Sequence, residues 1–249
     1  MTDPRPDDGW RPIERVDGAG WRWHEQPDRL TLDRVAAASI LAAADGAIRA
    51  RGRFHVVLAG GDTPRDVYAL LREASADWYG WHIWYGDERC VPADDPQRNS
   101  RMAGEAWLEH VAIPERQRHP VPAELGATRA ARAYAEVLRP LGEFDLVLLG
   151  LGEDGHTASL FPGHDWGTVS GSPDTLAVLD APKPPPERVT LSAARLSRAR
   201  QVVFLVAGAA KRQAVAAWRA GEPIPARAIT PASGVDILVE SRLLAPPPP

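Results

Sequence analysis

The sequence predicts an α/β fold: a mostly parallel, Rossmann-like sheet flanked by helices on both faces. Short runs of residues that are apolar throughout alternate with helical stretches along the chain. Strands of this kind are buried on both sides, as they are in parallel sheets that helices cover on each face. Polar or glycine-rich loops follow three of these runs, where such sheets bind their ligands.

The first half of the chain supplies a helix, a strand and a second helix. Leu30–Ala50 is rich in alanine and has apolar residues at helical spacing, which predicts a helix. Phe54–Ala59 is a short apolar run and is therefore predicted as a buried strand. A second helix is predicted over Pro64–Leu71, with Thr63 as its N-cap and Pro64 at the first helical position.

The rest of the chain continues this alternation of apolar strands and helices. Further strands are expected at Trp81–Tyr85, Phe144–Leu149, Val189–Leu191, Gln201–Ala207 and Val235–Val239. Further helices are expected at Arg101–His110, Thr128–Leu138 and Ala209–Arg219. Two stretches lack either pattern and are expected to be loops, the polar Gly86–Asn99 and the proline-rich Pro182–Pro186.

A single domain, residues 13–245, is expected between two termini of different composition. Residues 1–12 are polar and rich in proline and aspartate, which predicts a disordered arm, and residues 246–249 form a proline tail. No internal repeat divides the chain, and 249 residues are enough to bury a sizeable core.

Composition narrows the classes of function. The formal net charge of −4 argues against a nucleic-acid partner, which usually requires a basic surface. No apolar run reaches the length of about 20 residues that a membrane helix needs, and no secretion signal is recognised. The one cysteine, Cys90, excludes an intramolecular disulfide and favours a reducing compartment. We therefore expect a cytoplasmic protein, either a monomer or a weak homo-oligomer.

Two of the strand-end loops contain groups that could bind an anion. Gly60, Gly61, Asp62 and Thr63 join a strand to a helix, so their backbone N–H groups could cradle a phosphate; a tight turn with a good N-cap would look the same. In the second loop Arg89 could clamp a phosphate or carboxylate, with the two preceding carboxylates holding it in place. A solvated, salt-bridged loop is the alternative interpretation of that second cluster.

The third loop, Gly150–His156, carries the strongest local signal. It contains the spacing GxGxxG after a strand, but Pro162-Gly163 interrupts the long helix that a dinucleotide-binding unit needs. The loop places His156 at an expected helix start, two residues after Asp154. Because imidazole titrates near neutral pH, His156 is the candidate for a catalytic acid–base, although a lone histidine can also simply pack beneath a loop.

Lys183 in the proline-rich loop and Arg188 shortly after it could hold a phosphate, or could be ordinary surface cations.

The sequence gives no support for other catalytic chemistries. No GxSxG nucleophile elbow is present, and the histidines lack the HExxH spacing of a zinc site. The sequence therefore offers no set of zinc ligands.

Four segments together resemble the 6-phosphogluconolactonase family. They are LAGGDTP at 58–64, YGDERCVP at 85–92 followed by Asn99-Ser100, GLGEDGHTASLFP at 150–162 with His164, and PKPPPERVTL at 182–191. The resemblance spans about residues 30–240 in a consistent order, and its third segment is the most diagnostic. It implies the fold of the sugar-phosphate isomerases and deaminases.

The resemblance also implies a reaction and a set of site residues. The reaction is hydrolysis of 6-phospho-D-glucono-1,5-lactone to 6-phospho-D-gluconate in the pentose phosphate pathway, without a cofactor. By position, His156 matches the catalytic histidine, Asp154 its acidic neighbour, Arg89 an active-site arginine and Lys183 a cation on the phosphate side. Gly61 and Thr63 match the phosphate loop. Asp62 stands where the family often has serine, so phosphate should rest on backbone N–H groups, Thr63 and the cations.

Two alternatives remain at this stage. An amino-sugar-phosphate deaminase or isomerase on the same fold would need a carboxylate base near the ring, and the TASLFP stretch at 157–162 favours the lactonase instead. A sugar-phosphate sensor would keep the cations without needing a histidine base. It would usually carry a DNA-binding element, and no predicted helix pair has the basic face of one.

Overall fold

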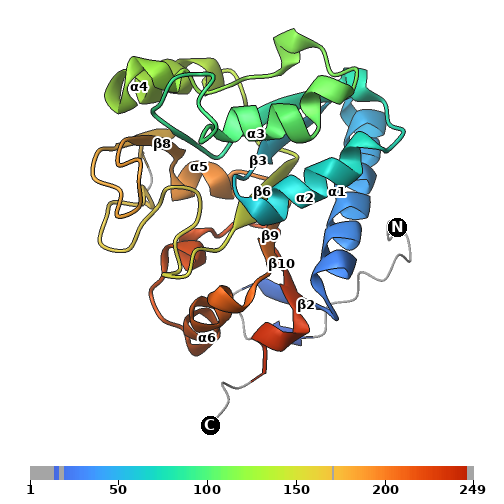
Figure 1. The fold of residues 1–249 in the computed structure, drawn as a ribbon, viewed down its shortest axis with the longest axis vertical. Helices are drawn as coiled ribbons and strands as arrows, with labels where there is room; N and C mark the ends of the chain where they lie inside the picture. The colour runs from blue at the N-terminus through green and yellow to red at the C-terminus, as the bar shows by residue number, and fades with distance from the viewer. Residues whose placement is uncertain (1–13, 17–19, 170, 246–249) are drawn as a thin grey trace.

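A computed structural model describes residues 14–16, 20–169 and 171–245 and confirms the predicted α/β class. The main sheet has seven strands in the order β1-β2-β10-β9-β6-β3-β4 (Figure 1). All neighbours are parallel except β1 and β2. The strands are β1 Glu14–Val16, β2 Trp21–Gln26, β3 Phe54–Leu58, β4 Trp81–Tyr85, β6 Leu146–Gly150, β9 Val202–Val206 and β10 Val235–Glu240. The predicted arm (1–12) and proline tail (246–249) lie outside the described residues.

A second, smaller sheet was not predicted. It is antiparallel and has the order β5-β8-β7, with β5 at Asp87–Arg89, β8 at Arg188–Leu191 and β7 at Thr175–Val178. The strand β5 lies within the stretch 86–99 that was expected to be a loop, because its side chains are all charged. This sheet brings Arg188 opposite Arg89 in the strand register, although the two residues are 99 positions apart in the sequence.

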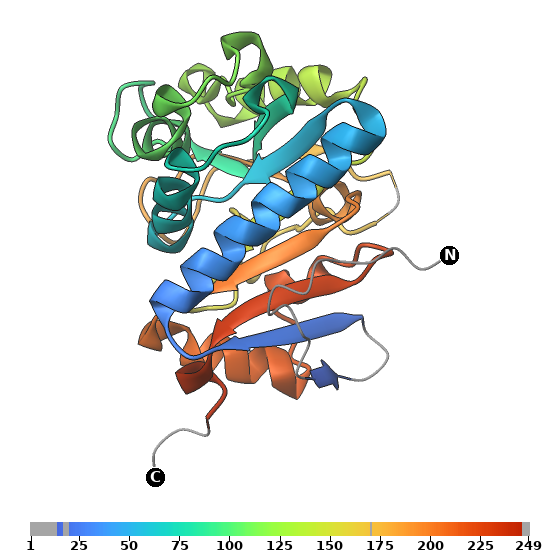
Figure 2. The ribbon, with the colours of Figure 1, turned by 90° about the vertical axis from the view of Figure 1, so that its right-hand side faces the viewer.

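Helices cover both faces of the main sheet (Figures 1 and 2). They are α1 Arg29–Arg51, α2 Asp62–Arg72, α3 Asn99–Ala106, α4 Ala127–Leu138, α5 Ala193–Ser197 and α6 Arg212–Ala220. The long α1 crosses one face, while Trp218 of α6 packs edge-to-face against Trp21 and Trp23 on the other, with ring centroids 6.1 and 5.6 Å apart. Every residue of β3, β9 and β10 is buried, which explains their apolar character. Within the described residues, no helix combines the length and the hydropathy that a membrane crossing requires.

The start of α2 differs from the prediction. Gly61, not Thr63, is the N-cap, and its φ of 101° lies in the region that favours glycine. Asp62 and Thr63 are therefore already helical, and Pro64 occupies the third helical position. Proline is tolerated there because the first N–H groups of a helix have no partner within it.

The strand order creates a divergence at the centre of the sheet. From β3 the chain continues outward to β4, whereas from β6 it continues to β9 and β10 in the opposite direction. The loops after β3 and β6 therefore lead away from each other and leave a crevice beyond the carboxyl ends of these two strands. In open α/β sheets, ligands bind at such a switch point.

Three histidines cluster at the opposite, amino end of β3 and β4, and they predict acid sensitivity. His55 and His82 are register partners, and His119 stacks on Trp84 with ring centroids 3.9 Å apart. Burial lowers the pKa of His55 and of His119 from 6.5 to about 4. Folding therefore favours the neutral form of each ring. At pH values between about 4 and 6.5, the unfolded chain binds more protons than the folded one.

The free energy of unfolding should accordingly fall as the pH drops from 6.5 toward 4. For His55 the loss should be about 1–3 kcal/mol, which corresponds to several degrees in Tm. Thermal unfolding followed across this pH range would measure it. The variant His119→Gln should show a shallower decline in Tm than the unmodified chain, and equal declines would contradict this origin of the acid sensitivity.

Candidate active site

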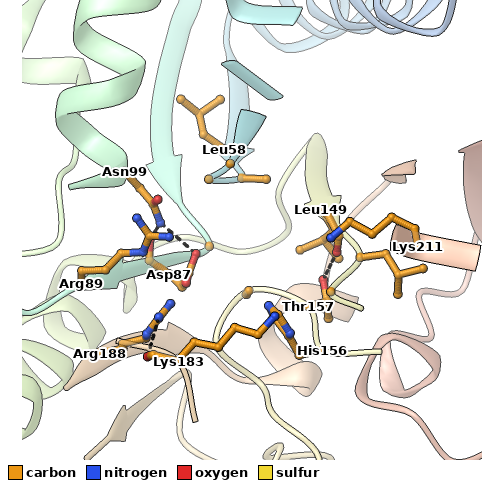
Figure 3. A pocket seen from close by; sticks show the side chains of 18 of the residues that line it. Leu58, Asp87, Arg89, Asn99, Leu149, His156, Thr157, Lys183, Arg188 and Lys211 are labelled. Carbon is orange, nitrogen blue, oxygen red and sulfur yellow. Dashed lines mark hydrogen bonds between the residues drawn. The ribbon is translucent and has the colours of Figure 1, made fainter. Parts of the chain in front are cut away.

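The predicted strand-end loops converge on one pocket of about 320 Å³ at the carboxyl edge of the sheet (Figure 3). The loop after β3 contributes Gly60 and Gly61, and the loop after β6 contributes His156. Arg89 reaches it from the small sheet. Thus the three loops that the sequence placed on one edge do meet there, at the switch point between β3 and β6.

His156 lies on the wall of this pocket and is held by Asp154. Its Nδ1 is 2.5 Å from Asp154 Oδ1, which also accepts the backbone N–H of His156 at 3.2 Å. The His156 side chain is 18% exposed and packs against Phe161, with ring centroids 4.8 Å apart. No helix begins at His156, contrary to the prediction. Instead, Gly152 N–H donates to His156 O at 2.7 Å and folds the loop back on itself.

This contact decides where the proton of the neutral imidazole lies. The pKa of Asp154 is lowered: burial would raise it, but the hydrogen bond and charge of His156 outweigh burial. An ionised carboxylate can only accept, so Nδ1 carries the proton and Nε2 keeps a free lone pair. Burial lowers the pKa of His156, and the opposing effect of Asp154 only partly offsets this. The lowered pKa favours a neutral ring near pH 7.

Gly152 makes room for this arrangement. A Cβ atom at this position would lie 2.0 Å from His156 Nδ1 and 2.2 Å from Cε1, where no side chain can fit. Gly60 has a similar constraint on the opposite wall, since its Cβ would lie 2.1 Å from Asn99 Oδ1. These glycines are therefore required by close packing around polar side chains.

Arg89 lines the pocket, but its neighbours differ from those predicted. Within the described residues, neither Asp87 nor Glu88 forms an ion pair with its guanidinium. Its Nη1 donates to Gln97 O at 2.5 Å, and its Nε is buried without a hydrogen-bond partner. The carboxylate of Glu88 instead accepts backbone N–H groups at the start of α3 and ion-pairs with Arg98 at 3.4 Å. Arg89 thus keeps donor capacity for a ligand.

The proline-rich loop brings two further cations to the pocket. Arg188 is buried, and its guanidinium donates to the carbonyl oxygens of Lys183 and Pro184 at 3.0 and 3.2 Å. Burial lowers the pKa of Arg188, which nonetheless remains a strong base. Figure 3 shows the Lys183 side chain extending toward His156. The ammonium group of Lys183 has no hydrogen bond or ion pair with any residue that the structure describes, so it is available to a ligand.

The glycine-rich loop is placed as predicted, but not all its side chains face the pocket. Gly60 and Gly61 line it, whereas Asp62 points away: its side chain is 81% exposed and pairs with Arg65 at 2.8 Å. Thr63 is half-buried and is not part of the pocket lining. Only the backbone of this loop therefore faces a ligand in the arrangement seen here.

Several pocket residues were absent from the predicted set of site residues, among them a lysine, an asparagine and an aspartate. Lys211 follows β9, Asn99 begins α3, and Asp87 begins β5, and all three line the pocket. Lys211 could have been found, because it follows a predicted strand and so lies at the same sheet edge as the other loops. Burial lowers the pKa of Lys211, and its ammonium group has no hydrogen bond or ion pair among the described residues. Among the described residues that line the pocket, Asp87 is the one with a carboxylate.

Known proteins resemble this chain in sequence and in structure. Residues 27–238 match the family described as glucosamine-6-phosphate isomerases/6-phosphogluconolactonase. A 6-phosphogluconolactonase of Mycobacterium tuberculosis is 41% identical over 208 residues, which cover 77% of this chain and 83% of that protein. One from Synechocystis sp. is 41% identical over 198 residues, covering 74% and 81% of the two chains.

A solved structure shares the fold. The crystal structure of 6-phosphogluconolactonase from Thermotoga maritima superposes with a TM-score of 0.80 at 28% identity, covering 89% of this chain and 99% of that one. The family match spans β3, β4, β6, β9 and most of β10, together with every residue that lines the pocket. This chain therefore belongs to the glucosamine-6-phosphate isomerase/6-phosphogluconolactonase family.

Proposed function

We propose that this protein hydrolyses 6-phospho-D-glucono-1,5-lactone to 6-phospho-D-gluconate, with His156 as the general base. The observation that carries the proposal is the orientation of one imidazole: Nδ1 is bound to Asp154, and the ring lines a pocket that also holds several cations. The names of the relatives supply the substrate, and the geometry supplies a means of opening its ring.

Ester hydrolysis requires two proton transfers, and one histidine can perform both. Nε2 of neutral His156 accepts a proton from water as that water attacks C1 of the lactone. The imidazolium then donates the proton to the ring oxygen as the C1–O bond breaks. Asp154 stabilises the positive ring and fixes its orientation, since its carboxylate already accepts from Nδ1. No covalent intermediate is required.

Arg89 is suited to stabilise the oxygen that becomes negative during the attack. Arg89 lines the pocket, and among the described residues only Gln97 O accepts from its guanidinium. Its remaining N–H donors can therefore form a strong hydrogen bond when an anion develops in the pocket. Backbone N–H groups of the loop after β6 are the alternative donors.

The anionic end of the substrate can be held by a separate group of donors. The backbone at Gly60–Gly61 precedes α2, whose N-terminus favours negative charge. Lys183, Arg188 and Lys211 add positive charge to the same pocket. Binding energy from this remote group positions the lactone carbonyl beside His156.

The direct test measures 6-phosphogluconate formation from freshly made lactone, above the spontaneous rate. Hydrolysis catalysed at substoichiometric protein concentration would support the proposal, and a rate equal to the spontaneous one would exclude it. Ammonia release from glucosamine 6-phosphate, measured in parallel, would identify the deaminase activity instead.

Removing one pocket lysine should weaken binding more than turnover. Lys183→Ala and Lys211→Ala should each raise KM by about tenfold while kcat changes little, because a phosphate contact is equally strong in the ground and transition states. Arg212→Ala is the matched control: this cation neighbours Lys211 but lies outside the pocket and binds Ala245 O. A loss confined to kcat would instead place the lysine at the reacting carbonyl.

A further inference from the structure

The carboxylate of Asp87 is a charged group in the pocket that the proposed mechanism leaves unused. Asp87 follows β4 and is 6% exposed, yet it lines the pocket. Figure 3 shows it beside Asn99, on the side of the pocket where Arg89 and Arg188 lie. It therefore lines the cavity that would receive the substrate.

Its two oxygens are only partly satisfied. Oδ1 accepts from Asn99 Nδ2 at 3.1 Å, and Oδ2 accepts from Ser159 Oγ at 2.6 Å. An ionised carboxylate offers about four acceptor sites, so about half remain open. Among the described residues, no arginine, lysine or histidine forms an ion pair with Asp87. Its charge acts on Arg188 and His156 without a direct contact, raising the pKa of each. A buried carboxylate that no cation contacts is costly, and such groups are concentrated at functional sites.

The chemistry of the pocket limits what this carboxylate can contact. It repels phosphate and carboxylate groups, which the nearby cations attract, and it can accept hydrogen bonds only from donors. A phosphorylated sugar lactone carries donors of one kind, its hydroxyl groups, and these lie between the phosphate and the carbonyl. The anionic end and the carbonyl both have other partners in this pocket.

We infer that Asp87 binds a ring hydroxyl of the substrate and thereby selects sugar lactones over phosphorylated lactones that lack this hydroxyl. The inference rests on the proposed function and adds to it the residue that determines specificity. Asn99 and Ser159 are positioning residues in this arrangement: they occupy one acceptor site on each oxygen and leave the remaining sites for the ligand.

The test combines one substitution with a series of substrates. Asp87→Asn keeps the size of the side chain, can still accept from Asn99, and can donate to Ser159 Oγ, so the fold should persist. Its kcat/KM on the parent lactone should fall by about 10- to 100-fold, the usual effect of losing a hydrogen bond to a charged group. The same variant is then assayed on the 2-, 3- and 4-deoxy analogues of the lactone.

One of these analogues should reveal the contacted hydroxyl. Unmodified protein should hydrolyse that analogue at least about tenfold less efficiently than the parent, whereas Asp87→Asn should treat the two nearly alike. A purely structural role cannot produce this dependence on the substrate. The inference is overturned if Asp87→Asn lowers kcat/KM by the same factor on every substrate, or on none.

Glu88→Gln provides the matched comparison for a structural carboxylate. Glu88 is fully buried and its oxygens accept the N–H groups of Asn99 and Ser100 at 2.7 and 2.8 Å, and it is not part of the pocket lining. Its loss should affect Tm, and any effect on kcat/KM should be uniform across the analogues.

A binding measurement separates this inference from the proposed function. Calorimetric titration with 6-phosphogluconate and its deoxy analogues reports the Asp87 contact without turnover. If the protein binds these compounds but does not hydrolyse the lactone, the proposed function fails. The hydroxyl contact is still supported if one deoxy analogue binds more weakly to the unmodified protein but not to Asp87→Asn. If neither binding nor hydrolysis occurs, both are overturned.

Discussion

His156→Ala is expected to lower kcat for lactone hydrolysis by about 10²–10⁴-fold, the usual contribution of general acid–base catalysis. The loss should appear in kcat and kcat/KM alike, because the imidazole acts on the reacting water and on the ring oxygen and not on the phosphate. Stopped assays on fresh lactone, corrected for spontaneous opening, would measure it. Retention of near-normal activity would remove His156 from the mechanism.

The pH dependence provides an independent check on the same residue. The base must be neutral, so kcat/KM should decline on the acid side, with a midpoint below 6.5 because burial lowers the pKa of His156. Asp154 opposes that shift. Asp154→Asn should therefore move the midpoint to still lower pH, while also lowering activity through loss of the fixed ring orientation. A midpoint that does not respond to Asp154→Asn would assign the titration to another group.

Gly152→Ala is expected to abolish most activity although it adds a single methyl group. That carbon would lie 2.0 Å from His156 Nδ1, so the imidazole must leave its place and lose its contact with Asp154. A displacement of about 1 Å can reduce a rate by about 100-fold. We expect a fall of that order or more in kcat, measured together with Tm, which should change little because His156 is not part of the core.

Gly142→Ala is the control for this prediction. Gly142 lies just before β6, its φ is not positive, and an added Cβ would meet no atom within 4 Å. Both kcat and Tm should therefore be nearly unchanged. If Gly152→Ala were equally harmless, the close approach of Gly152 and His156 would not exist in solution.

Sequence patterns predicted correctly those strands and helices in which a buried face continues along the whole element. The strands β3, β4, β9 and β10 were predicted to within about a residue, because parallel strands covered on both faces must be apolar throughout. The strand β2, which lies between β1 and β10, was missed, since WRWHEQ mixes buried tryptophans with polar residues. Within it, His24 can be buried because Asp236 of β10 lies 2.8 Å from its Nε2, a contact between residues 212 positions apart.

The candidate site was predictable to the level of loops but not of side-chain directions. The rule that ligands bind beyond strand ends placed Gly60, Arg89 and His156 together, and the structure agrees. The same rule could not tell that Asp62 turns outward to Arg65, since that depends on Gly61 being the helix cap. The rule also placed the loop that contains Asp87 at this edge, but it could not reveal that Asp87 is buried between Asn99 and Ser159.

The sequence by itself determined the parallel α/β architecture, the edge of the sheet at which the site forms, and the histidine that faces it. These follow from local rules: apolar runs need burial on two faces, and strand ends in such a sheet share one edge. Only the tertiary structure decided the tautomer of His156, the direction of Asp62 and the environment of Asp87. Those depend on contacts of a few ångströms between segments far apart in the chain, which local sequence patterns do not encode.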